Sequence, residues 1–314
     1  MDRFEDMRCF LQVVETQSVT RAAEVMGLAP SAVSRRLKEL ERRLGATLMT
    51  RTTRRMSLTE AGQIFASRAE RVLADLQEAE AEVSDSAHLL SGTLRVACPL
   101  SFGVAHLTPI VAEFMEAHPD LLVELDLSDR QVDLVAEGLD LAIRIGDLED
   151  SSLMARRVAD VSLWPVASPA FLDRMGRPDT PSGIANWPAL VYVGSTKADA
   201  WRYTAPDGTE GAQAMNIRMK ANNGNVLRDA AIRGLGIALQ PSFILYKSVA
   251  RGDLEVVLPD YRWQTIPIHT IYPQTRHLSA KARAFMDFVR AKIGQRPVWE
   301  EALRSQTKLV QPAE

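Results

Sequence analysis

The first sixty residues alternate apolar and polar positions with a helical period. Apolar residues in the segment FEDMRCFLQVVE recur three and four positions apart, which predicts an amphipathic helix over residues 4–15. Ser18 and Gly27 supply a typical N-cap and a typical C-terminal stop for a second, shorter helix between them. After a tight turn, residues 31–45 predict a third helix.

The third helix has two distinct faces. Its inward stripe is apolar and consists of Val33, Leu37, Leu40 and Leu44. Its outward face near the N-terminus consists of Ser31, Ser34, Arg35 and Lys38. Two helices joined by a tight turn, the second with Ser and Arg outward, predict a helix-turn-helix that reads base edges in the major groove of DNA. The alternative for these residues is a solvated helix face.

An arginine-rich turn follows the third helix. A short strand is predicted at Leu48 and Met49, and another at residues 56–58. The turn between them contains Arg51, Thr52, Arg54 and Arg55. This pattern predicts a small β-wing, whose positive charge is favoured by phosphates and by the minor groove.

A long charged helix is predicted from about residue 60 to residue 88. Its apolar positions alternate steps of four and three and consist of Phe65, Ala69, Val72, Leu76, Ala79 and Val83. This spacing is the seam of a coiled coil. The simplest partner is the same helix of a second chain, related by a two-fold axis. The alternative is that the stripe packs against its own domain.

From Thr93 onward, short apolar strands alternate with helices. Strands are predicted at LRVACP, LLVELDL, LDLAIRIG, VSLWPVAS, PALVYVG, NIRMKAN, GIALQ and IPIHTIYP. Helices are predicted at residues 102–117, 223–233, 242–250 and 279–293, with a short one in RQVDLVAEG. Such alternation is typical of an α/β fold with parallel strands. The last residues, 297–314, contain two prolines and few apolar positions, so we expect a loose tail there.

Composition and charge sharpen this organisation. The 314 residues are 46% hydrophobic and 25% charged, as in an ordinary globular protein, and no apolar stretch reaches the length of a membrane span. The acidic start of the chain lacks an apolar signal region, so we expect a cytoplasmic protein. The net charge is -3, but residues 31–60 hold eight Lys or Arg against three Asp or Glu. This local excess predicts an anion-binding surface.

The same residues argue against several other functions. No glycine-rich dinucleotide loop and no Walker loop is present. The histidines show no metal-ligand spacing and no partnered nucleophile, and Cys9 and Cys98 match no disulfide framework or metal site. We therefore expect no catalysis, no cofactor and no metal. A stand-alone binder of transported solutes would need export and would leave the basic segment unexplained.

About sixty contiguous residues at the start of the chain resemble the LysR-type transcriptional regulators. The resemblance rests on Ala22-Ala23, the PSAVSRRL run, Leu44-Gly45, the arginine-rich wing and the LTEAG segment that begins at Leu58. One departure is Ala29, where the family often has Ser or Thr to cap the recognition helix; Pro30 or Ser31 is expected to compensate in part.

The resemblance implies a complete domain plan. It consists of a winged helix-turn-helix over residues 1–60, a linker and dimerisation helix over 61–91, an effector-binding domain over 92–296 and the tail over 297–314. The effector-binding domain would be like a periplasmic binding protein, with two α/β lobes that clasp a ligand. The first lobe is expected at about 92–162 and 268–294, and the second at about 163–267.

Ligands of open α/β sheets bind beyond the carboxyl ends of the strands. The candidate effector-binding residues at such ends are Leu100, Ser101, Phe102, Arg144, Ile145, Asn222, Asn223, Gln240 and Pro241. Free amides at a helix start and the Arg144 cation favour a carboxylate, so we expect an organic acid. The alternatives are that Ser101 and Asn223 are plain helix caps and that Arg144 is a salt-bridge residue. Trp164, Tyr192 and Trp201 are expected to lie in the core or at the rim.

The expected function is sequence-specific regulation of transcription. An effector between the lobes would control DNA bending or the geometry of the oligomer. The expected partners are double-stranded DNA, a small-molecule effector and further copies of the chain in a dimer and a tetramer, with RNA polymerase as a further candidate and no membrane. The alternative is a DNA-binding regulator whose rear domain only oligomerises and binds no ligand.

Overall fold

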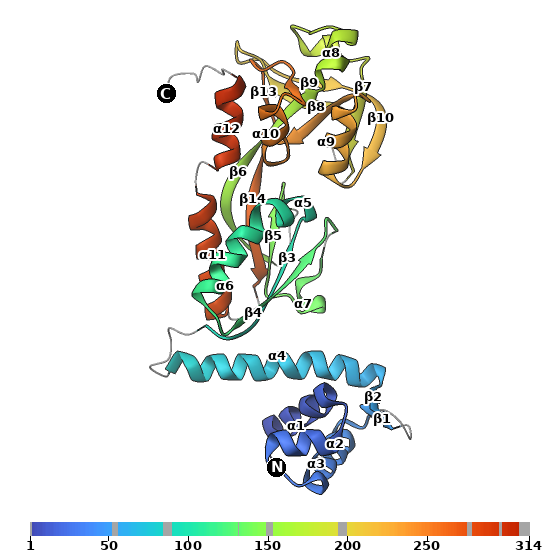
Figure 1. Cartoon of the computed structure of the whole chain (residues 1–314), viewed down its shortest axis with the longest axis vertical. Helices are drawn as coiled ribbons and strands as arrows, with labels where there is room; N and C mark the ends of the chain where they lie inside the picture. Colours follow the sequence, from blue (N-terminus) through green and yellow to red (C-terminus); the bar gives the residue numbers. More distant parts are fainter. Residues whose placement is uncertain are drawn as a thin grey trace. The chain divides into compact units, whose positions relative to one another are not determined.

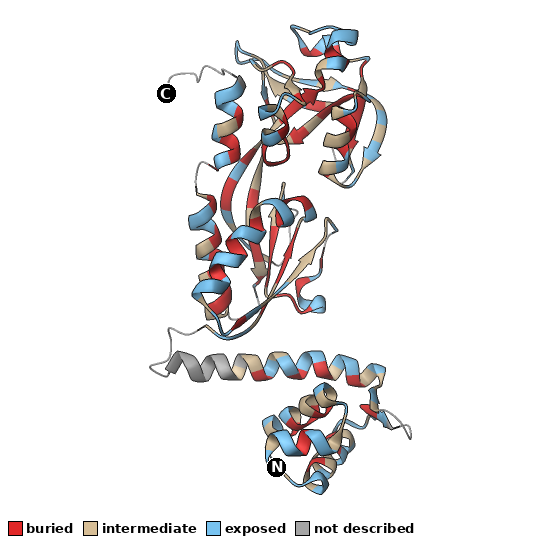
Figure 2. Ribbon diagram, viewed as in Figure 1, coloured by how far each residue is buried: buried red, intermediate tan, exposed pale blue. Residues whose placement is uncertain are grey.

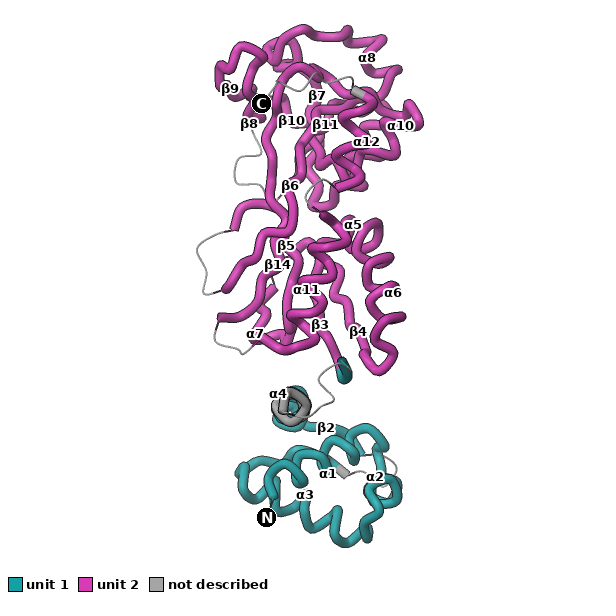
Figure 3. The backbone as a smooth tube through the Cα atoms, turned by 90° about the vertical axis from the view of Figure 1, so that its left-hand side faces the viewer, with its two compact units in different colours: residues 1–92 teal, residues 93–314 magenta. Residues whose placement is uncertain are grey.

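The computed structural model describes residues 2–51, 56–83, 90–130, 132–148, 153–193, 200–274, 278–294 and 297–307, without the side chains of 51, 75 and 77–83. The chain divides into two compact units, residues 1–92 and 93–314, which are treated separately below (Figure 3). None of the described helices is long and apolar enough to cross a membrane.

The first unit contains the three predicted helices, which are confirmed as α1 (Arg3–Thr16), α2 (Val19–Met26) and α3 (Pro30–Leu44). The Ser18 side chain caps α2 by accepting a hydrogen bond from the backbone N–H of Arg21 at 3.3 Å. The helix α3 begins with Pro30 at its first position, and Ala29 before it makes no side-chain cap. Pro30 therefore compensates through its fixed φ, which suits the first helical turn.

The predicted wing is present as the antiparallel strands β1 (Met49–Arg51) and β2 (Met56–Leu58). The carboxylate of Glu41 on α3 accepts hydrogen bonds from the backbone N–H groups of Leu48 at 2.8 Å and Met49 at 3.2 Å. These bonds attach the start of the wing to α3. Thr52, Arg54 and Arg55 lie outside the described residues, and so does the side chain of Arg51.

The long helix α4 (Glu60–Val83) starts in close contact with the wing. A Cβ atom on Gly62 would lie 2.0 Å from the backbone oxygen of Leu48. Only glycine fits at this position, because a clash with backbone cannot be relieved by rotating a side chain. This contact explains the glycine of the LTEAG segment in physical terms.

The predicted dimer seam on α4 needs correction at its start. The Phe65 ring packs against Phe10 of α1 with 5.5 Å between ring centroids, and Ala69 is only 1% exposed within the single chain. Buried positions recur along this part of α4, including Leu73 (Figure 2). Phe65 therefore packs on the core of its own domain, which is the alternative raised above. Val72 is exposed and Leu76 half-buried, and the side chains of Ala79 and Val83 lie outside those described.

The second unit is built on a mixed sheet. The strands run in the order β10-β7-β11-β6-β14-β5-β3-β4, and β12 adds to β6. Their bounds are β3 Gly92–Cys98, β4 Leu121–Leu127, β5 Leu141–Ile145, β6 Leu153–Ala167, β7 Pro188–Tyr192, β10 Asn216–Ala221, β11 Ile237–Pro241, β12 Glu255–Val256 and β14 Thr265–Pro273. The predicted parallel pairing holds for β3 with β5 and for β7 with β10 and β11, whereas β6 and β14 run antiparallel to their neighbours.

Two long strands divide this sheet into two lobes (Figure 1). The strand β6 pairs with β14 up to Ser162 and with β11 from Leu163 onward. Lobe 1 is the part of the sheet from β14 to β4, and lobe 2 is the part from β11 to β10. Both lobes therefore share one continuous backbone strand.

Helices cover the sheet in both lobes. Lobe 1 carries α5 Leu100–Phe102, a π-helical turn Gly103–Leu107, α6 Thr108–Ala117, α7 Leu134–Glu137 and α11 Ala280–Ile293. Lobe 2 carries α8 Pro169–Met175, a 3₁₀ turn Pro181–Ile184, α9 Gly224–Ile232 and α10 Ser242–Ala250. The segment predicted as one helix over residues 102–117 thus contains a π-helical turn, which shifts the helical phase before α6.

A small second sheet in lobe 2 has no counterpart in the sequence-based prediction. It consists of β8 Ala200–Thr204, β9 Glu210–Ala214 and β13 Arg262–Trp263 in the order β13-β8-β9. Trp201 and Trp263 are buried beneath it, with 6.4 Å between ring centroids. The sheet is held by these two indoles rather than by a long apolar run, so its sequence signal is weak.

The prediction of a loose tail after residue 296 is wrong for the helix α12 (Val298–Thr307), which packs against α10. Pro297 suits a helix start, and its carbonyl accepts a hydrogen bond from the backbone N–H of Glu300 at 2.9 Å. Trp299 and Leu303, one helical turn apart, are 6% and 0% exposed. Two buried side chains are enough to dock the helix, although they are too few to show as a periodic pattern.

Replacing Leu303 by Ala tests the docking of α12. We expect Leu303→Ala to lower the free energy of unfolding by about 2–5 kcal/mol, because it leaves a cavity between α12 and lobe 2. The matched control is Val298→Ala on the same helix, where the side chain is 73% exposed and little change is expected. Urea unfolding followed by circular dichroism measures both variants. Equal unfolding midpoints would contradict the docking of α12 through Leu303 and would favour the original prediction of a loose tail.

Candidate functional site

The outward face of α3 carries the predicted recognition residues. Ser31, Arg35 and Lys38 are exposed and Ser34 is half-buried. They are spaced at i, i+3, i+4 and i+7, which places them on one face, while Val33, Leu37 and Leu40 are buried on the other. No hydrogen bond or ion pair joins the side chain of Arg35 to the rest of the described chain, so its donors are free to contact another molecule.

A buried carboxylate holds two other arginines of α3. Asp6 on α1 is 1% exposed, and its two carboxylate oxygens accept from Arg36 at 3.3 Å and from Arg43 at 3.1 Å. Arg42 pairs instead with Glu39 along the helix, at 2.8 Å. The three-dimensional fold therefore separates structural arginines from those that face solvent, a distinction that sequence alone does not make.

A second candidate site is a cavity of about 370 Å³ between the lobes of the second unit. Its polar lining includes Ser101, Asp129, Arg144, Tyr192, Gln240 and Gln264, and its apolar lining includes Phe102, Leu163, Leu190, Trp201, Ile244 and Ile266. The volume lies in the usual range for small-molecule sites, and apolar walls with a few polar groups are their usual chemistry. The cavity can enclose one small organic molecule.

Six of the predicted residues line this cavity and three do not. Those that line it are Ser101, Phe102, Arg144, Ile145, Gln240 and Pro241. Leu100 is 40% exposed and Asn222 is exposed. Asn223 caps α9, because its side-chain oxygen accepts from the backbone N–H groups of Asn225 at 3.0 Å and Val226 at 3.3 Å. The amides at this helix start are therefore not free for an anion, contrary to the prediction.

Several cavity residues were missed by the sequence-based prediction. Tyr192 and Trp201, expected in the core or at the rim, both line the cavity. Asp129 lies two residues beyond the end of β4, and Asp147 two residues beyond the end of β5, so the rule that selected Arg144 could also have selected them. Gln264 and Ile266 come from the crossing region at the start of β14, which no strand-end rule would find.

Arg144 is the half-buried cation of the cavity. One of its guanidinium nitrogens, Nη1, donates to the backbone oxygen of Arg130 at 3.0 Å. Burial lowers the pKa of Arg144 from its ordinary value, and the charge of Arg130 acts in the same direction, while Tyr192 and Asp129 oppose the change. Burial and Asp129 in turn raise the pKa of the Tyr192 hydroxyl. An arginine that is partly desolvated binds a carboxylate more strongly than an exposed one does.

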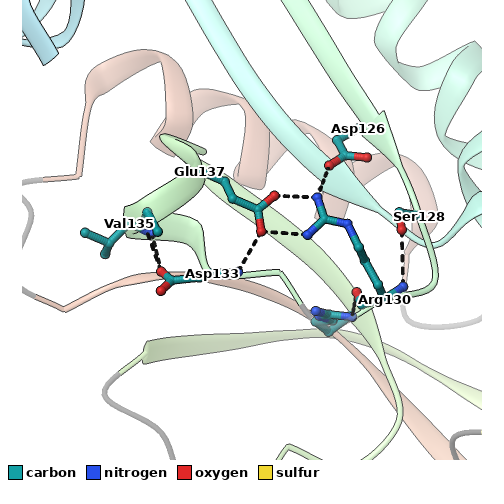
Figure 4. A network of polar contacts seen from close by, with 8 residues as sticks. Asp126, Ser128, Arg130, Asp133, Val135 and Glu137 are labelled. Carbon is teal, nitrogen blue, oxygen red and sulfur yellow. Dashed lines mark hydrogen bonds and ion pairs between the residues drawn. The ribbon is translucent and has the colours of Figure 1, made fainter. Parts of the chain in front are cut away.

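A surface network holds the loop that carries Asp129 and Arg130. The guanidinium of Arg130 donates to Glu137 at 2.7 Å and to Asp126 at 3.1 Å, and Glu137 also accepts from the backbone N–H of Asp133 at 3.1 Å (Figure 4). The hydrogen bond from Arg130 holds the pKa of Glu137 below its usual value. Carboxylates thus neutralise Arg130 outside the cavity, and its backbone oxygen is held in place to orient Arg144.

An aromatic cluster joins the lobes at the wall of the cavity. The Phe102 ring packs edge to face against Phe243 of lobe 2, with 5.3 Å between centroids, and Trp299 of α12 packs against His106 at 4.5 Å. A ring nitrogen of His106, Nε2, lies 3.1 Å from the backbone oxygen of Phe243. Burial lowers the pKa of His106, which favours the neutral ring.

Groups that would suggest metal or thiol chemistry are not gathered in either site. Within the described part of the chain, no group of three His, Cys, Asp or Glu could hold a metal ion. Cys9 and Cys98 are buried free thiols, and burial raises the pKa of both. A thiol with a raised pKa is a poor nucleophile.

Two family models match the chain. Residues 4–63 match the bacterial regulatory helix-turn-helix protein, lysR family, and residues 87–294 match the LysR substrate binding domain. An HTH-type transcriptional regulator of Haemophilus influenzae is 36% identical over 283 residues, covering 90% of this chain and 97% of the relative. PtxR of Pseudomonas aeruginosa is 34% identical over 290 residues, covering 92% of each.

Solved structures agree with these matches. The structure of CrgA, a LysR-type transcriptional regulator from Neisseria meningitidis, is similar with a TM-score of 0.59 and 32% identity, covering 93% of this chain and 99% of that one. Full-length AphB of Vibrio cholerae is similar with a TM-score of 0.57 and 30% identity, covering 92% of this chain and 99% of that one. The relatives are named as transcriptional regulators, which agrees with the expectation that the chain is not an enzyme.

Gly224 tests the packing of the cavity wall. A Cβ atom there would lie 2.3 Å from Cδ1 of Ile244 and 2.8 Å from Oε1 of Gln240, and both side chains line the cavity. Because both atoms are the ends of side chains that can shift, we expect Gly224→Ala to lower the free energy of unfolding only by about 1 kcal/mol through overpacking. The control is Val226→Ala on the exposed side of the same helix, and urea unfolding compares the two. An unchanged or raised stability of Gly224→Ala would contradict this packing.

Proposed function

The chain belongs to the LysR family of bacterial transcriptional regulators, and from that premise we propose how its two units work. The outward face of α3 reads a specific DNA site, and a carboxylate-bearing effector in the interlobe cavity controls the DNA bending or the oligomer geometry. A DNA-binding role also favours a cytoplasmic location. The observation that carries the proposal is the free, outward Arg35 beside Ser31, Ser34 and Lys38, while Asp6 holds Arg36 and Arg43.

The DNA contacts divide by chemistry. Arg35 has the geometry to bond a guanine edge in two places, and Ser31 and Ser34 can bond bases or phosphates. Lys38 and the wing residues Arg51, Thr52, Arg54 and Arg55 would contact phosphates or the minor groove. The local excess of positive charge in residues 31–60 supports the same placement, because it favours association with a polyanion.

The effector would act on an equilibrium between lobe arrangements. A ligand can shift such an equilibrium only by binding one arrangement better than the other. The cavity is lined from both lobes, by Ser101 and Arg144 on one side and by Gln240 and Trp201 on the other. A molecule that contacts both sides therefore favours the closed arrangement, and this supports regulation at this site over a rear domain that only oligomerises.

Self-association is part of the proposal. The chain would dimerise through α4 beyond the segment that packs on α1, with Val72 and Leu76 followed by Ala79 and Val83. Val72 is 41% exposed and Ile64 is 60% exposed, so α4 keeps apolar side chains outside its own core. Two dimers would join as a tetramer, and contact with RNA polymerase is a further part of the proposed mechanism.

Arg35→Ala tests the DNA-reading face. We expect it to weaken binding to a DNA site selected from a random pool by about 1–3 kcal/mol and to relax the base preference at one position, because a bidentate base contact is lost. The control is Arg42→Ala on the same helix, whose guanidinium already pairs with Glu39. Gel-shift titration measures the DNA affinity of both variants. Wild-type affinity of the Arg35→Ala protein would contradict the assignment of Arg35 as a residue that contacts bases.

Arg144→Met tests the effector cavity. In a screen of carboxylic acids by thermal shift, we expect the wild type to bind at least one compound and Arg144→Met to bind it at least about tenfold more weakly, because a charge-assisted pair is lost. Arg218→Met, at an exposed position of β10, is the control. If no acid stabilises the wild type, the rear domain binds no such ligand and the oligomerising alternative gains support.

A further inference from the structure

The side chain of Gln240, one of the cavity residues, carries a buried acceptor without a hydrogen-bond partner among the described groups. It is 1% exposed, its Nε2 donates to the backbone oxygen of Leu239 at 3.0 Å, and Oε1 receives no hydrogen bond from any described group. Exchanging the amide oxygen and nitrogen would place two acceptors, Oε1 and the Leu239 oxygen, against each other. The bond to Leu239 therefore fixes an acceptor, not a donor, on the side of the amide that faces Gly224 at the cavity wall.

A carboxylate lies at the same corner of the cavity. The Nδ2 of Asn223 is 3.5 Å from Oδ2 of Asp129 and 3.4 Å from Oγ of Ser101. The next residue, Gly224, approaches Oε1 of Gln240 so closely that a Cβ atom would lie 2.8 Å from it. Asp129 and Gln240 thus converge on the Asn223–Gly224 turn from opposite lobes. Among the described ion pairs, none involves Asp129.

Arg144 supplies a positive charge to the cavity without forming an ion pair with Asp129. Its guanidinium donates to the backbone oxygen of Arg130, and the described contacts include no ion pair between Arg144 and Asp129. The cavity therefore contains a cation and an anion that are both available to a ligand. An apolar wall, which includes Leu163, Trp201 and Ile266, surrounds them.

A ligand with one charged group would leave part of this site unsatisfied. A simple monocarboxylate would pair with Arg144 but would shield Asp129 from water without giving it a donor, and it would leave the already buried Oε1 of Gln240 unpaired. Leaving such groups buried and unpaired weakens binding, and the loss is largest for a charged group. A simple amine would satisfy the acceptors and leave Arg144 unpaired. A molecule with both groups satisfies all three.

We propose that the effector is a zwitterionic amino acid with an apolar side chain, whose carboxylate pairs with Arg144 and whose ammonium donates to Asp129 and Gln240. The apolar side chain contacts the wall formed by Leu163, Trp201 and Ile266. This assignment rests on the proposed function, in which the cavity takes an effector, and it narrows the organic acid of that proposal to one that also carries an amino group.

Matched ligands test the assignment on the full-length protein. The panel consists of the apolar L-amino acids, including leucine, methionine and phenylalanine, each with its desamino acid and its decarboxylated amine. We expect thermal shift and calorimetry to find an amino acid that binds at least about tenfold more tightly than either matched compound, since each lacks one charged contact. Binding of a desamino acid as tight as that of its amino acid would overturn the zwitterion while leaving an effector site in place.

The complete absence of binding has a different meaning. If no amino acid, acid or amine in the panel binds, both the zwitterion assignment and the proposed carboxylate effector fail. If only desamino acids bind, the proposed function stands and the further inference is rejected. The two proposals can therefore fail separately.

Two variants test whether the ammonium group of the ligand contacts Gln240 and Asp129. We expect Gln240→Met and Asp129→Asn each to weaken binding of the amino acid at least about tenfold while changing the affinity for its desamino partner much less. The controls are Gln213→Met on β9 and Asp207→Asn in the turn before it, where no change is expected. Equal weakening of both ligands by the cavity variants would show a general effect on the cavity and would contradict recognition of the amino group.

Discussion

The backbone ladder between β6 and β14 is the constraint on which the second unit depends. It runs from Leu153 opposite Pro273 to Ser162 opposite Thr265, where β6 exchanges β14 for β11 as its partner. Because one strand is hydrogen-bonded in both lobes, relative motion of the lobes must be absorbed where the partner changes. Leu163, Gln264 and Ile266 lie at this change and line the cavity. A ligand in the cavity would therefore contact the segment that has to bend when the lobes move.

The C-terminal helix reaches the same segment from the other side. The carboxylate of Glu300 on α12 accepts from the backbone N–H of Ser162 at 2.8 Å and from the hydroxyl of Ser242, the first residue of α10. Glu300 is 6% exposed, so both bonds are shielded from water. The helix α12, which the sequence-based prediction took for a loose tail, thus attaches the crossing strand β6 to lobe 2. Pro241 of that lobe lines the cavity. Shielded hydrogen bonds to a charged group are strong enough to bias the geometry of such a hinge.

The sequence predicted those helices and strands whose buried apolar residues recur with a regular period within the element itself. The helices α1 to α3 and strands such as β3 and β11 show their period locally, and the order of strands and helices indicates the α/β lobes. It could not predict features that depend on a partner distant in sequence. The packing of Phe65 depends on Phe10 of α1, the burial of Trp299 on Phe102 and His106, and the cavity role of Gln264 on the position of β14. Strand ends identified Arg144 and Gln240 because that rule concerns topology rather than contacts.

The two units use charge in the same way, by binding some charged groups internally so that others remain available. In the first unit, Asp6 engages Arg36 and Arg43 and leaves Arg35 outward. In the second, Glu137 and Asp126 engage Arg130 and leave Arg144 facing the cavity. An arginine that faces solvent or a cavity next to an internally paired one is partly preorganised, because its neighbour cannot rearrange to compete for the same anion. A count of arginines along the chain therefore overstates the number that can recognise a partner, and the buried or surface carboxylates that pair with the rest determine which ones do.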